Sequence, residues 1–283
     1  IAHGSTGAGN DQVRFDMIFQ IIAPEIEIIT PIRDKQLSRQ EEIEYLKQNG
    51  VEMNWEKSKY SVNKGLWGTS VGGAETLTSE KPLPESAYPS QLQEKEPKQI
   101  SLTFIKGELS AVNGKENSPE KNIEILEKIA SRYAIGRDIH VGDTIIGIKG
   151  RVGFEAAAAL ITIKAHHLLE KHTLSKWQLQ HKDYLANWYG THLHEGQYLE
   201  PVMRDLEAFL ESSQKQVSGE VFVRLYPYRF TLDGIKSKND LMNSNFGNYG
   251  EENKAWTGDD AKGFIKILSN AGKIYQHVNK PSS

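Results

Sequence analysis

Cysteine is absent from all 283 residues of the chain. This absence excludes disulfide bonds, a thiolate nucleophile, iron–sulfur ligation and cysteine-based zinc sites, and it fits a reducing cytoplasm. No apolar run approaches the roughly 18 residues that a membrane helix needs, so we expect no membrane partner. The formal net charge of −3 offers no broad attraction to nucleic acid or to an anionic membrane. Small molecules are therefore the expected ligands.

Hydrophobic periodicity predicts a mixture of helices and strands without a regular βαβ repeat. An opening loop is followed by a helix over 12–22 and a buried strand over 26–30, a unit of α/β type. The segment 52–97 is rich in Gly, Pro, Ser and Glu and is expected to be irregular. Hairpins are expected over 99–112 and 221–232, and further helices over 38–49, 118–136, 154–171, 175–190 and 199–214. The pattern predicts an α+β body attached to a short α/β remnant.

The opening residues IAHGSTGAGNDQVRF combine glycines with small hydroxyl and amide side chains. The glycines at positions 4, 7 and 9 allow the backbone to approach a ligand closely, and the N–H groups at the start of the following helix favour anions. Arg14 lies one turn along that helix, where it would reach the same ligand. The alternative is a glycine-rich turn capped by Asn10 or Asp11.

Four blocks of the sequence resemble the argininosuccinate synthase family, in the family's order and across nearly the whole chain. The opening HGSTGAGNDQVRF is similar to the family's substrate-binding loop HG-x-TGKGNDQVRFE, with Ala8 in place of the usual Lys. KYSVNKGLWGTS over 59–70 resembles a segment with two serines separated by an NLWG-type stretch. AIGRDIHVGDTIIGIKGRVGFEAAAAL over 134–160 resembles the GVGR-x-D…IG-x-KSRG-x-YE-x-PA block, and DDAKGFIKI over 259–267 resembles the tail motif DA-x-GFI.

The resemblance implies an α+β synthetase and oligomerisation domain attached to the C-terminal remnant of an α/β nucleotide-binding domain of the adenine nucleotide α-hydrolase type. Residues 1–47 would end the nucleotide-binding domain, 48–250 would form the synthetase domain, and 251–283 the oligomerisation tail. The family's SGGLDTS-type ATP loop has no counterpart here, because SVGGAET over 70–76 lies in the wrong segment. We therefore expect a chain that corresponds to the C-terminal two-thirds of the enzyme and is inert by itself.

The activity that the resemblance implies is the ATP-dependent joining of citrulline and aspartate, in arginine biosynthesis, by a cytoplasmic homotetramer. ATP, with Mg²⁺, would convert the ureido oxygen of citrulline to an adenylate and release pyrophosphate, and the amine of aspartate would then give argininosuccinate and AMP. Carried over by the motifs, the aspartate-binding residues are Thr6, Asn10 and Asp11. The citrulline-binding residues are Asn10, Arg14, Ser61, Ser70, Gly142 and Phe154. The ATP-binding residues are Ala2, His3, Gly4, Gly7 and Gly9. No individual catalytic residue and no metal ligand is assigned.

The chain departs from the family around one end of citrulline. Gly142 stands where the family has a Glu that pairs with the α-ammonium group, and Phe154 stands where a Tyr hydroxyl helps to bind the same substrate. Ser70 is followed by Val71 and Gly72 where the pattern usually supplies another Glu. One interpretation is sequence drift, with the lost acids replaced by Asp143, Glu155 or Glu75. The other is that the enzyme takes an Nα-acylated citrulline, acetyl or succinyl, because an α-ammonium buried without partners is costly. Room for the acyl group would come from Gly72, Gly73 and Gly142, and a succinyl carboxylate would meet Lys149 or Arg151.

Two other groups of residues have structural interpretations. The histidines lack carboxylate partners at a recognisable metal-binding spacing, so surface or packed histidines are expected at His166, His167, His172, His192 and His194. Four aromatic residues fall at helical spacing and are expected to bury a helix face rather than stack on bases; they are Trp177, Tyr184, Trp188 and Tyr189.

Functions of other classes remain to be separated from this one. A tRNA-modifying relative of the same nucleotide-binding superfamily is disfavoured by the negative net charge and the lack of cysteine. A non-catalytic oligomeric fragment stays open, because the ATP loop is absent. The tail carries an apolar stripe that resembles the family's segment crossing to neighbouring subunits, or that packs on its own chain; it comprises Ala261, Phe264, Ile265, Ile267, Leu268 and Ile274.

Overall fold

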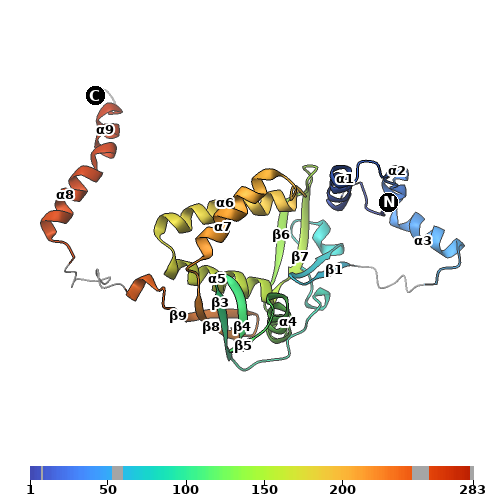
Figure 1. Cartoon of the computed structure of the whole chain (residues 1–283). Coiled ribbons are helices and arrows are strands. Elements are labelled where there is room, and N and C mark those ends of the chain that lie inside the picture. Colours follow the sequence, from blue (N-terminus) through green and yellow to red (C-terminus); the bar gives the residue numbers. More distant parts are fainter. Residues whose placement is uncertain (8, 53–59, 244–254, 281–283) are drawn as a thin grey trace. The chain divides into compact units, whose positions relative to one another are not determined.

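The computed structural model describes residues 1–7, 9–52, 60–243 and 255–280 (Figure 1). The chain divides into two compact units, residues 1–239 and residues 240–283. Every residue that the resemblance assigns to a site lies in the first unit. Ala8, which stands in place of the family's usual Lys, lies outside the described residues. Among the described helices, none has the length and apolar character to cross a membrane.

The N-terminal segment contains α1 (Asp11–Ile22), α2 (Pro31–Lys35) and α3 (Arg39–Gln48). The two longer helices confirm the expectation from periodicity, whereas the strand expected over 26–30 is wrong. In its place a single parallel bridge joins Ile29 to Ala2, and the Ile29 side chain is 51% exposed. An apolar run reads as a strand from sequence, but one bridging neighbour does not supply the sheet that would bury it.

The first sheet has the order β1-β2-β7-β6, with every pair antiparallel. Its strands are β1 (Ser61–Gly65), β2 (Gly68–Gly72), β6 (Arg137–Asp143) and β7 (Lys149–Glu155). Neither hairpin was expected from the sequence, and the first one replaces part of the irregular segment over 52–97. Residues 53–59 of that segment lie outside the described residues. After β2, the described part of the segment contains the short 3₁₀ turns Ala74–Leu77 and Glu85–Ala87.

The second sheet, of order β5-β4-β3-β8-β9, carries the main hydrophobic core. The expected hairpins are confirmed as β3 (Lys98–Ile105) with β4 (Glu108–Val112), and β8 (Gly219–Tyr226) with β9 (Arg229–Lys236); β5 covers only Lys115–Glu116. The inward side chains of β3 and β8 pack against α4 and α5 around Leu102, Phe104, Leu126 and Val223. This core joins the helices to one face of the second sheet.

Helix α4 (Pro119–Ala130) begins as predicted, because the Ser118 side chain accepts a hydrogen bond from the Lys121 N–H. It ends earlier than Gly136 and passes through the 3₁₀ turn Ser131–Tyr133. Gly136 then takes a φ of 85°, and a Cβ there would come within 2.6 Å of the backbone of Ala157. The close crossing fixes the start of β6 against the start of α5.

The helices expected near 154–171, 175–190 and 199–214 are confirmed as α5 (Ala157–Thr173), α6 (Lys176–His194) and α7 (Pro201–Gln214), and α6 and α7 lie side by side (Figure 1). The expectation that four aromatic residues bury a face of α6 is wrong for three of them, whereas Tyr189 is half-buried and donates a hydrogen bond to Glu207. Trp177, Tyr184 and Trp188 are 61%, 62% and 49% exposed. The helical spacing correctly indicated that these residues share one face of α6. It could not indicate whether other described residues cover that face.

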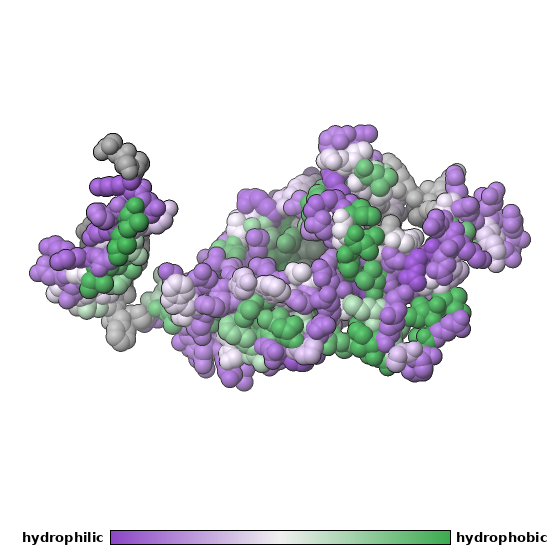
Figure 2. Space-filling view, turned by 90° about the horizontal axis from the view of Figure 1, so that it is seen from above, coloured by the Kyte–Doolittle hydropathy of each residue, from purple (hydrophilic) through white to green (hydrophobic). Residues whose placement is uncertain are grey.

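The C-terminal unit contains the 3₁₀ turn Leu241–Asn243, α8 (Gly258–Leu268) and α9 (Asn270–Val278). Its apolar residues form a stripe that is visible along this unit in Figure 2. Phe264, Ile267 and Ile274 are 64%, 71% and 64% exposed. Packing on the unit's own described residues therefore does not bury the stripe.

Candidate functional site

The first sheet gathers four of the predicted citrulline-binding positions on one face. Paired residues in an antiparallel sheet share a face, and residues two apart along a strand do so as well. Ser70 pairs with Phe154, and Ser61 pairs with Gly72 two residues from Ser70. Gly142 pairs with Gly150, which is four residues from Phe154 and so on the same face. We call this the open face; Ser61, Ser70, Phe154 and Gly142 are all partly or largely exposed on it.

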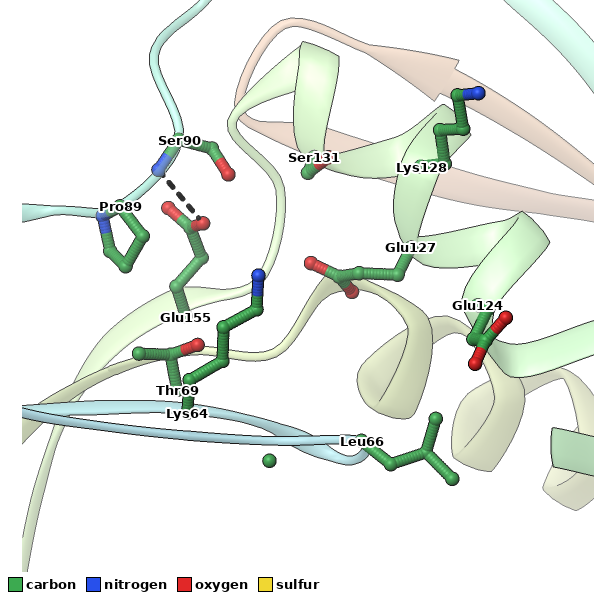
Figure 3. A pocket seen from close by; sticks show the side chains of 11 residues that line it. Lys64, Leu66, Thr69, Pro89, Ser90, Glu124, Glu127, Lys128, Ser131 and Glu155 are labelled. Carbon is green, nitrogen blue, oxygen red and sulfur yellow. Dashed lines mark hydrogen bonds between the residues drawn. The ribbon is translucent and has the colours of Figure 1, made fainter. Parts of the chain in front are cut away.

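The opposite face of the same sheet is buried at its centre, around Val71 and Glu155, and holds an ion pair there. Glu155 is 3% exposed, and its Oε2 lies 2.8 Å from Nε of Arg137. The other oxygen, Oε1, accepts a hydrogen bond of 3.2 Å from the Ser90 N–H, drawn as the dashed line in Figure 3. Arg137 also contacts the carboxylate of Glu85 and donates to the Ser90 carbonyl. The face away from the predicted substrate side chains is therefore the one that anchors the sheet.

A pocket of about 600 Å³ lies beside this buried face, at the turn of the β1–β2 hairpin (Figure 3). Its lining includes Lys64, Thr69, Glu127 and Glu155, and none of the residues that the resemblance assigns to a ligand. Glu127 accepts a hydrogen bond from the Ala158 N–H at the start of α5. Burial, with a smaller contribution from the charge of Glu155, raises the pKa of Glu127 above its usual value. The pocket and the open face lie on opposite sides of the sheet.

The opening loop is tied to α1 and α2 by a polar network. The His3 ring nitrogen Nε2 lies 2.7 Å from Oδ1 of Asp16, and Arg33 Nη1 donates to Oδ2 of Asp16, also at 2.7 Å. Arg33 Nη2 donates to the hydroxyl of Thr30. Burial acts to raise the pKa of Asp16, but the hydrogen bonds from His3 and Arg33 outweigh it and lower that pKa. The predicted ATP-contacting residue His3 is thus held by an ionised carboxylate.

The remaining residues of this loop stay accessible. Ala2 bridges to Ile29, and the Gly9 N–H donates to the Thr6 carbonyl. Gln12 donates to the Gly7 carbonyl, and Gly4 lies near Ile32 of α2. Gly4, Thr6 and Gly7 are exposed. The loop is therefore shaped by its own backbone bonds and leaves one side free for a ligand.

Asn10 links this loop to the first sheet. Asn10 is the N-cap residue of α1, as the alternative of a capped turn expects, but its side chain makes no capping bond. Instead Asn10 Oδ1 accepts a hydrogen bond of 2.9 Å from the N–H of Ile145, in the turn between β6 and β7. Ile145 is three residues from Gly142 in the sequence. The bond brings the predicted aspartate loop to the end of the open face.

Arg14 and Asp11 occupy the outer side of the same helix. Arg14 Nε donates to the His194 carbonyl at 2.8 Å, and Nη1 lies 3.4 Å from Oδ1 of Asp11. Gly196, with a φ of 79°, sits where a Cβ would come within 3.2 Å of the Arg14 side chain. The guanidinium is thus placed by the end of α6, and its side chain remains 32% exposed.

The position of the lost carboxylate at Gly142 is filled by a residue that sequence reasoning missed. His140 pairs with Val152 and lies on the open face, two residues before Gly142. A Cβ added to Gly142 would stand 2.6 Å from Nε2 of His140, so the imidazole lies over the glycine. The room that we expect at Gly142 therefore depends on where the exposed His140 side chain lies. Asp138, which pairs with Phe154, is a second polar residue of this face that was not singled out.

Four of the five proposed replacement acids and acyl-binding cations lie on the opposite face of the sheet. Asp143 and Lys149 pair with each other on the opposite face, with Nζ and Oδ2 2.6 Å apart. Glu155 is buried there, and the Glu75 carboxylate accepts from the Tyr60 hydroxyl at 2.6 Å. Arg151 donates to backbone carbonyl groups of Glu75, Thr78 and Lys81. Compensation by Asp143 or Glu155, and recognition by Lys149 or Arg151, are both ruled out by this arrangement.

Carboxylates that the sequence spacing did not point to lie close to His167 in the fold. Glu170 is fully buried on α5, and one of its oxygens lies 3.2 Å from Nδ1 of His167. With Asp183 these groups lie within 4.8 Å of one another, the spacing of a small cation site. Lys182 already places its ammonium nitrogen 2.5 Å from Glu170. The cluster is thus a buried ion-pair network, in which His166 and Lys182 lower the pKa of Glu170 against the opposing effect of burial.

Comparison with known families and proteins gives a consistent result. The family description "Arginosuccinate synthase C-terminal domain" matches residues 60–275, and "Arginosuccinate synthase N-terminal HUP domain" matches residues 1–52. Argininosuccinate synthase of Dictyoglomus turgidum is 37% identical over 277 residues, which are 97% of this chain and 70% of that protein. The enzyme of Methanocaldococcus jannaschii is 37% identical over 283 residues, 99% of this chain and 71% of that protein. That of Xanthomonas campestris pv. campestris is 34% identical over 292 aligned positions, 99% of this chain and 72% of that protein.

Proposed function

The chain belongs to the argininosuccinate synthase family, and we propose that it takes part in the ATP-dependent joining of citrulline and aspartate. The ureido oxygen of citrulline attacks the α-phosphorus of ATP, pyrophosphate leaves, and a citrullyl-adenylate forms. The amine of aspartate then attacks the ureido carbon and loses a proton, and AMP leaves with the former ureido oxygen. Activation and positioning carry such a reaction, so no covalent nucleophile is needed. The observation that carries the proposal is the Asn10–Ile145 bond, because it connects the aspartate loop with the sheet that holds the citrulline positions.

The residues of the first unit divide between the substrates in this proposal. Thr6, Asn10 and Asp11 bind aspartate, since a hydroxyl, an amide and a carboxylate together suit its two carboxylates and its ammonium group. Arg14 pairs with the carboxylate of the citrulline substrate through its planar fork of donors. Ser61 and Ser70 contact the same substrate from the open face. Gly142 and Phe154 form the part of that face nearest the substrate's α-nitrogen.

ATP is proposed to lie along the accessible side of the opening loop. The backbone of Ala2, His3, Gly4, Gly7 and Gly9 lines it, and Mg²⁺ accompanies the phosphates without a protein ligand assigned in this chain. The His3–Asp16–Arg33 network keeps the loop in place against α1 and α2.

A second candidate is the same reaction on an Nα-acylated citrulline. It is favoured by His140, which covers Gly142 and gives the open face an imidazole where an α-ammonium group would require a carboxylate. The division into a nucleotide-binding end (1–47), a synthetase domain (48–250) and an oligomerisation tail (251–283), the homotetramer and the cytoplasmic location remain proposals. The exposed stripe of α8 and α9 supports self-association, and a non-catalytic oligomer is the alternative of another class.

Two adjacent residues of β2 give a matched test of the proposal. The full-length protein is assayed for pyrophosphate release that requires ATP, aspartate and a citrulline substrate together. Ser70→Ala on the open face is expected to raise the KM for the citrulline substrate about tenfold, the loss of roughly one hydrogen bond. Thr69→Val on the buried face is the control and is expected to stay within about twofold. Pyrophosphate release that does not depend on citrulline or its acylated forms would contradict the proposal.

A further inference from the structure

We propose that His140 is a specificity-determining residue that selects a citrulline carrying an acyl group on its α-nitrogen. The inference rests on the proposed function, because it concerns the substrate class of the same site. His140 comes from β6 and lies on the open face with the citrulline positions Ser61, Ser70 and Phe154. None of the roles carried over from the family involves this residue.

The place of the imidazole depends on the glycine beneath it. Nε2 of His140 stands 2.6 Å from the position of a Cβ on Gly142, so a side chain at 142 would require the imidazole to shift. His140 and Gly142 therefore form one unit, in which a side chain two residues earlier occupies the space over the glycine. Because Ile145 is held by Asn10, this end of the β6–β7 hairpin is also fixed to the aspartate loop.

An imidazole N–H is able to donate a hydrogen bond to the oxygen of an acyl group. A ring N–H donates to a carbonyl or carboxylate oxygen, whereas an ammonium group offers three donors and needs acceptors. An amide nitrogen carries no charge, so an acylated substrate removes the need for a carboxylate at this place. The acids Asp143 and Glu155 lie on the opposite face, where each has a cationic partner. The open face thus offers a donor at the position over Gly142.

Space for the added group lies along the same face. A Cβ on Gly72 would be 3.9 Å from Val152, and one on Gly150 would be 3.9 Å from Thr144, which are ordinary contact distances. On this face Gly72 and Gly150 carry no side chain, and Val152 lies beside Gly72. The acyl methylene or methyl groups would lie on this part of the face while the acyl oxygen accepts from His140.

Asp138 is the residue that would serve a free α-ammonium group. It pairs with Phe154 in the same row as Ser70, and its Oδ1 accepts a hydrogen bond of 2.7 Å from the neighbouring Ile139 N–H. A carboxylate there is able to receive an ammonium group. The choice between acylated and free citrulline is thus a choice between His140 and Asp138, which separate variants can decide.

The experiment compares three substrates in the full-length protein at matched concentrations of ATP and aspartate: citrulline, Nα-acetylcitrulline and Nα-succinylcitrulline. The variants are His140→Ala, His140→Gln, Asp138→Asn and, as a matched control, His181→Ala on the exposed side of α6. We expect the wild-type protein to have the higher kcat/KM with an acylated substrate. His140→Ala should lower that value about 5- to 10-fold through KM, the effect of one hydrogen bond, while His140→Gln keeps a donor and recovers part of it. His181→Ala should change neither substrate.

The outcomes separate this inference from the proposed function. A preference for one acylated form tells whether an acetyl carbonyl or a succinyl carboxylate is read, and either result supports the inference. A higher kcat/KM with free citrulline that falls in Asp138→Asn overturns it and leaves the proposed function standing. An acyl preference unchanged in His140→Ala overturns the role of His140. No pyrophosphate release with any of the three substrates contradicts the proposed function itself.

Discussion

Replacing Glu155 by Gln removes one charge from the buried ion pair beneath the candidate site. The two side chains are 3% and 8% exposed, so Arg137 would keep its charge in an environment largely without water. Removing one partner of a buried pair costs about 3–5 kcal/mol. We expect the lower end, about 3 kcal/mol, because Arg137 also contacts the half-exposed Glu85. For a unit of this size, that corresponds to a fall in Tm of about 6–12 °C.

The assay is thermal unfolding followed by circular dichroism, with two comparisons. Lys149→Ala breaks an exposed pair whose side chains are 70% and 61% accessible, and it should cost less than about 1 kcal/mol. The double variant Arg137→Met with Glu155→Leu removes both charges and should recover most of the loss, since no charge is left buried. A Glu155→Gln shift as small as that of Lys149→Ala would refute the reasoning that burial makes this pair matter.

Three further changes have defined directions. Arg14→Ala in the full-length protein should weaken binding of the citrulline substrate by about 2–4 kcal/mol, seen as a higher KM, because a charge-assisted pair is lost. Glu127→Gln should raise the Tm at pH 7. The raised pKa of the half-buried Glu127 means that the folded protein loses stability as the pH rises above 4.5, the ordinary pKa of this group, so the difference in Tm between the variant and the wild type should vanish below pH 4.5. Lys182→Met should lower stability by about 3 kcal/mol, because it leaves the fully buried Glu170 without its ammonium partner.

Each of these has its own control and its own contradicting result. Arg204→Ala, an exposed arginine on α7, should leave KM unchanged, and an equal KM in the Arg14 variant would argue against the citrulline pairing. A Tm gain in Glu127→Gln that persists at pH 4 would show that ionisation is not its cause. Lys262→Met in the exposed i,i+3 pair of α8 should be nearly neutral, and the same result for Lys182→Met would contradict the burial argument.

The sequence predicted those helices and hairpins whose ends are set by capping or turn residues a few positions apart. Ser118 and Pro119 marked the start of α4, and Lys106 with Gly107 marked the turn of the β3–β4 hairpin; these residues have φ values of 51° and 86°. The β1–β2 and β6–β7 hairpins were not predicted from the sequence. Their open face carries Ser, Asn, Asp and Gly, so the alternation of apolar and polar residues along the strands is weak. The apolar run over 26–30 was wrongly predicted as a strand for the opposite reason, since among the described residues it forms a single bridge, from Ile29 to Ala2.

The candidate site was predictable as a set of residues but not as a surface. The motifs pointed to Asn10, Ser61, Ser70 and Phe154, and the register of the first sheet places the last three on one face. Which acids share that face depends on the pairing of the strands, which cannot be predicted from the sequence pattern. In the structure, Asp143 and Glu155 lie on the other face. The position of His140 could not be predicted for the same reason, because its side chain lies over Gly142 only when β6 is extended. The alternation of Ile139 and Val141 around it was the one local sign of a strand.

We propose that the ureido oxygen of the citrulline substrate is activated by adenylation. The most direct measurement uses a substrate labelled with ¹⁸O in the ureido group, free or Nα-acylated, together with ATP, aspartate and the full-length protein. The account predicts that the label appears in the phosphate of AMP, in amounts equal to the argininosuccinate or acyl-argininosuccinate formed. AMP without the label, or a condensed product formed with no AMP, would contradict the account.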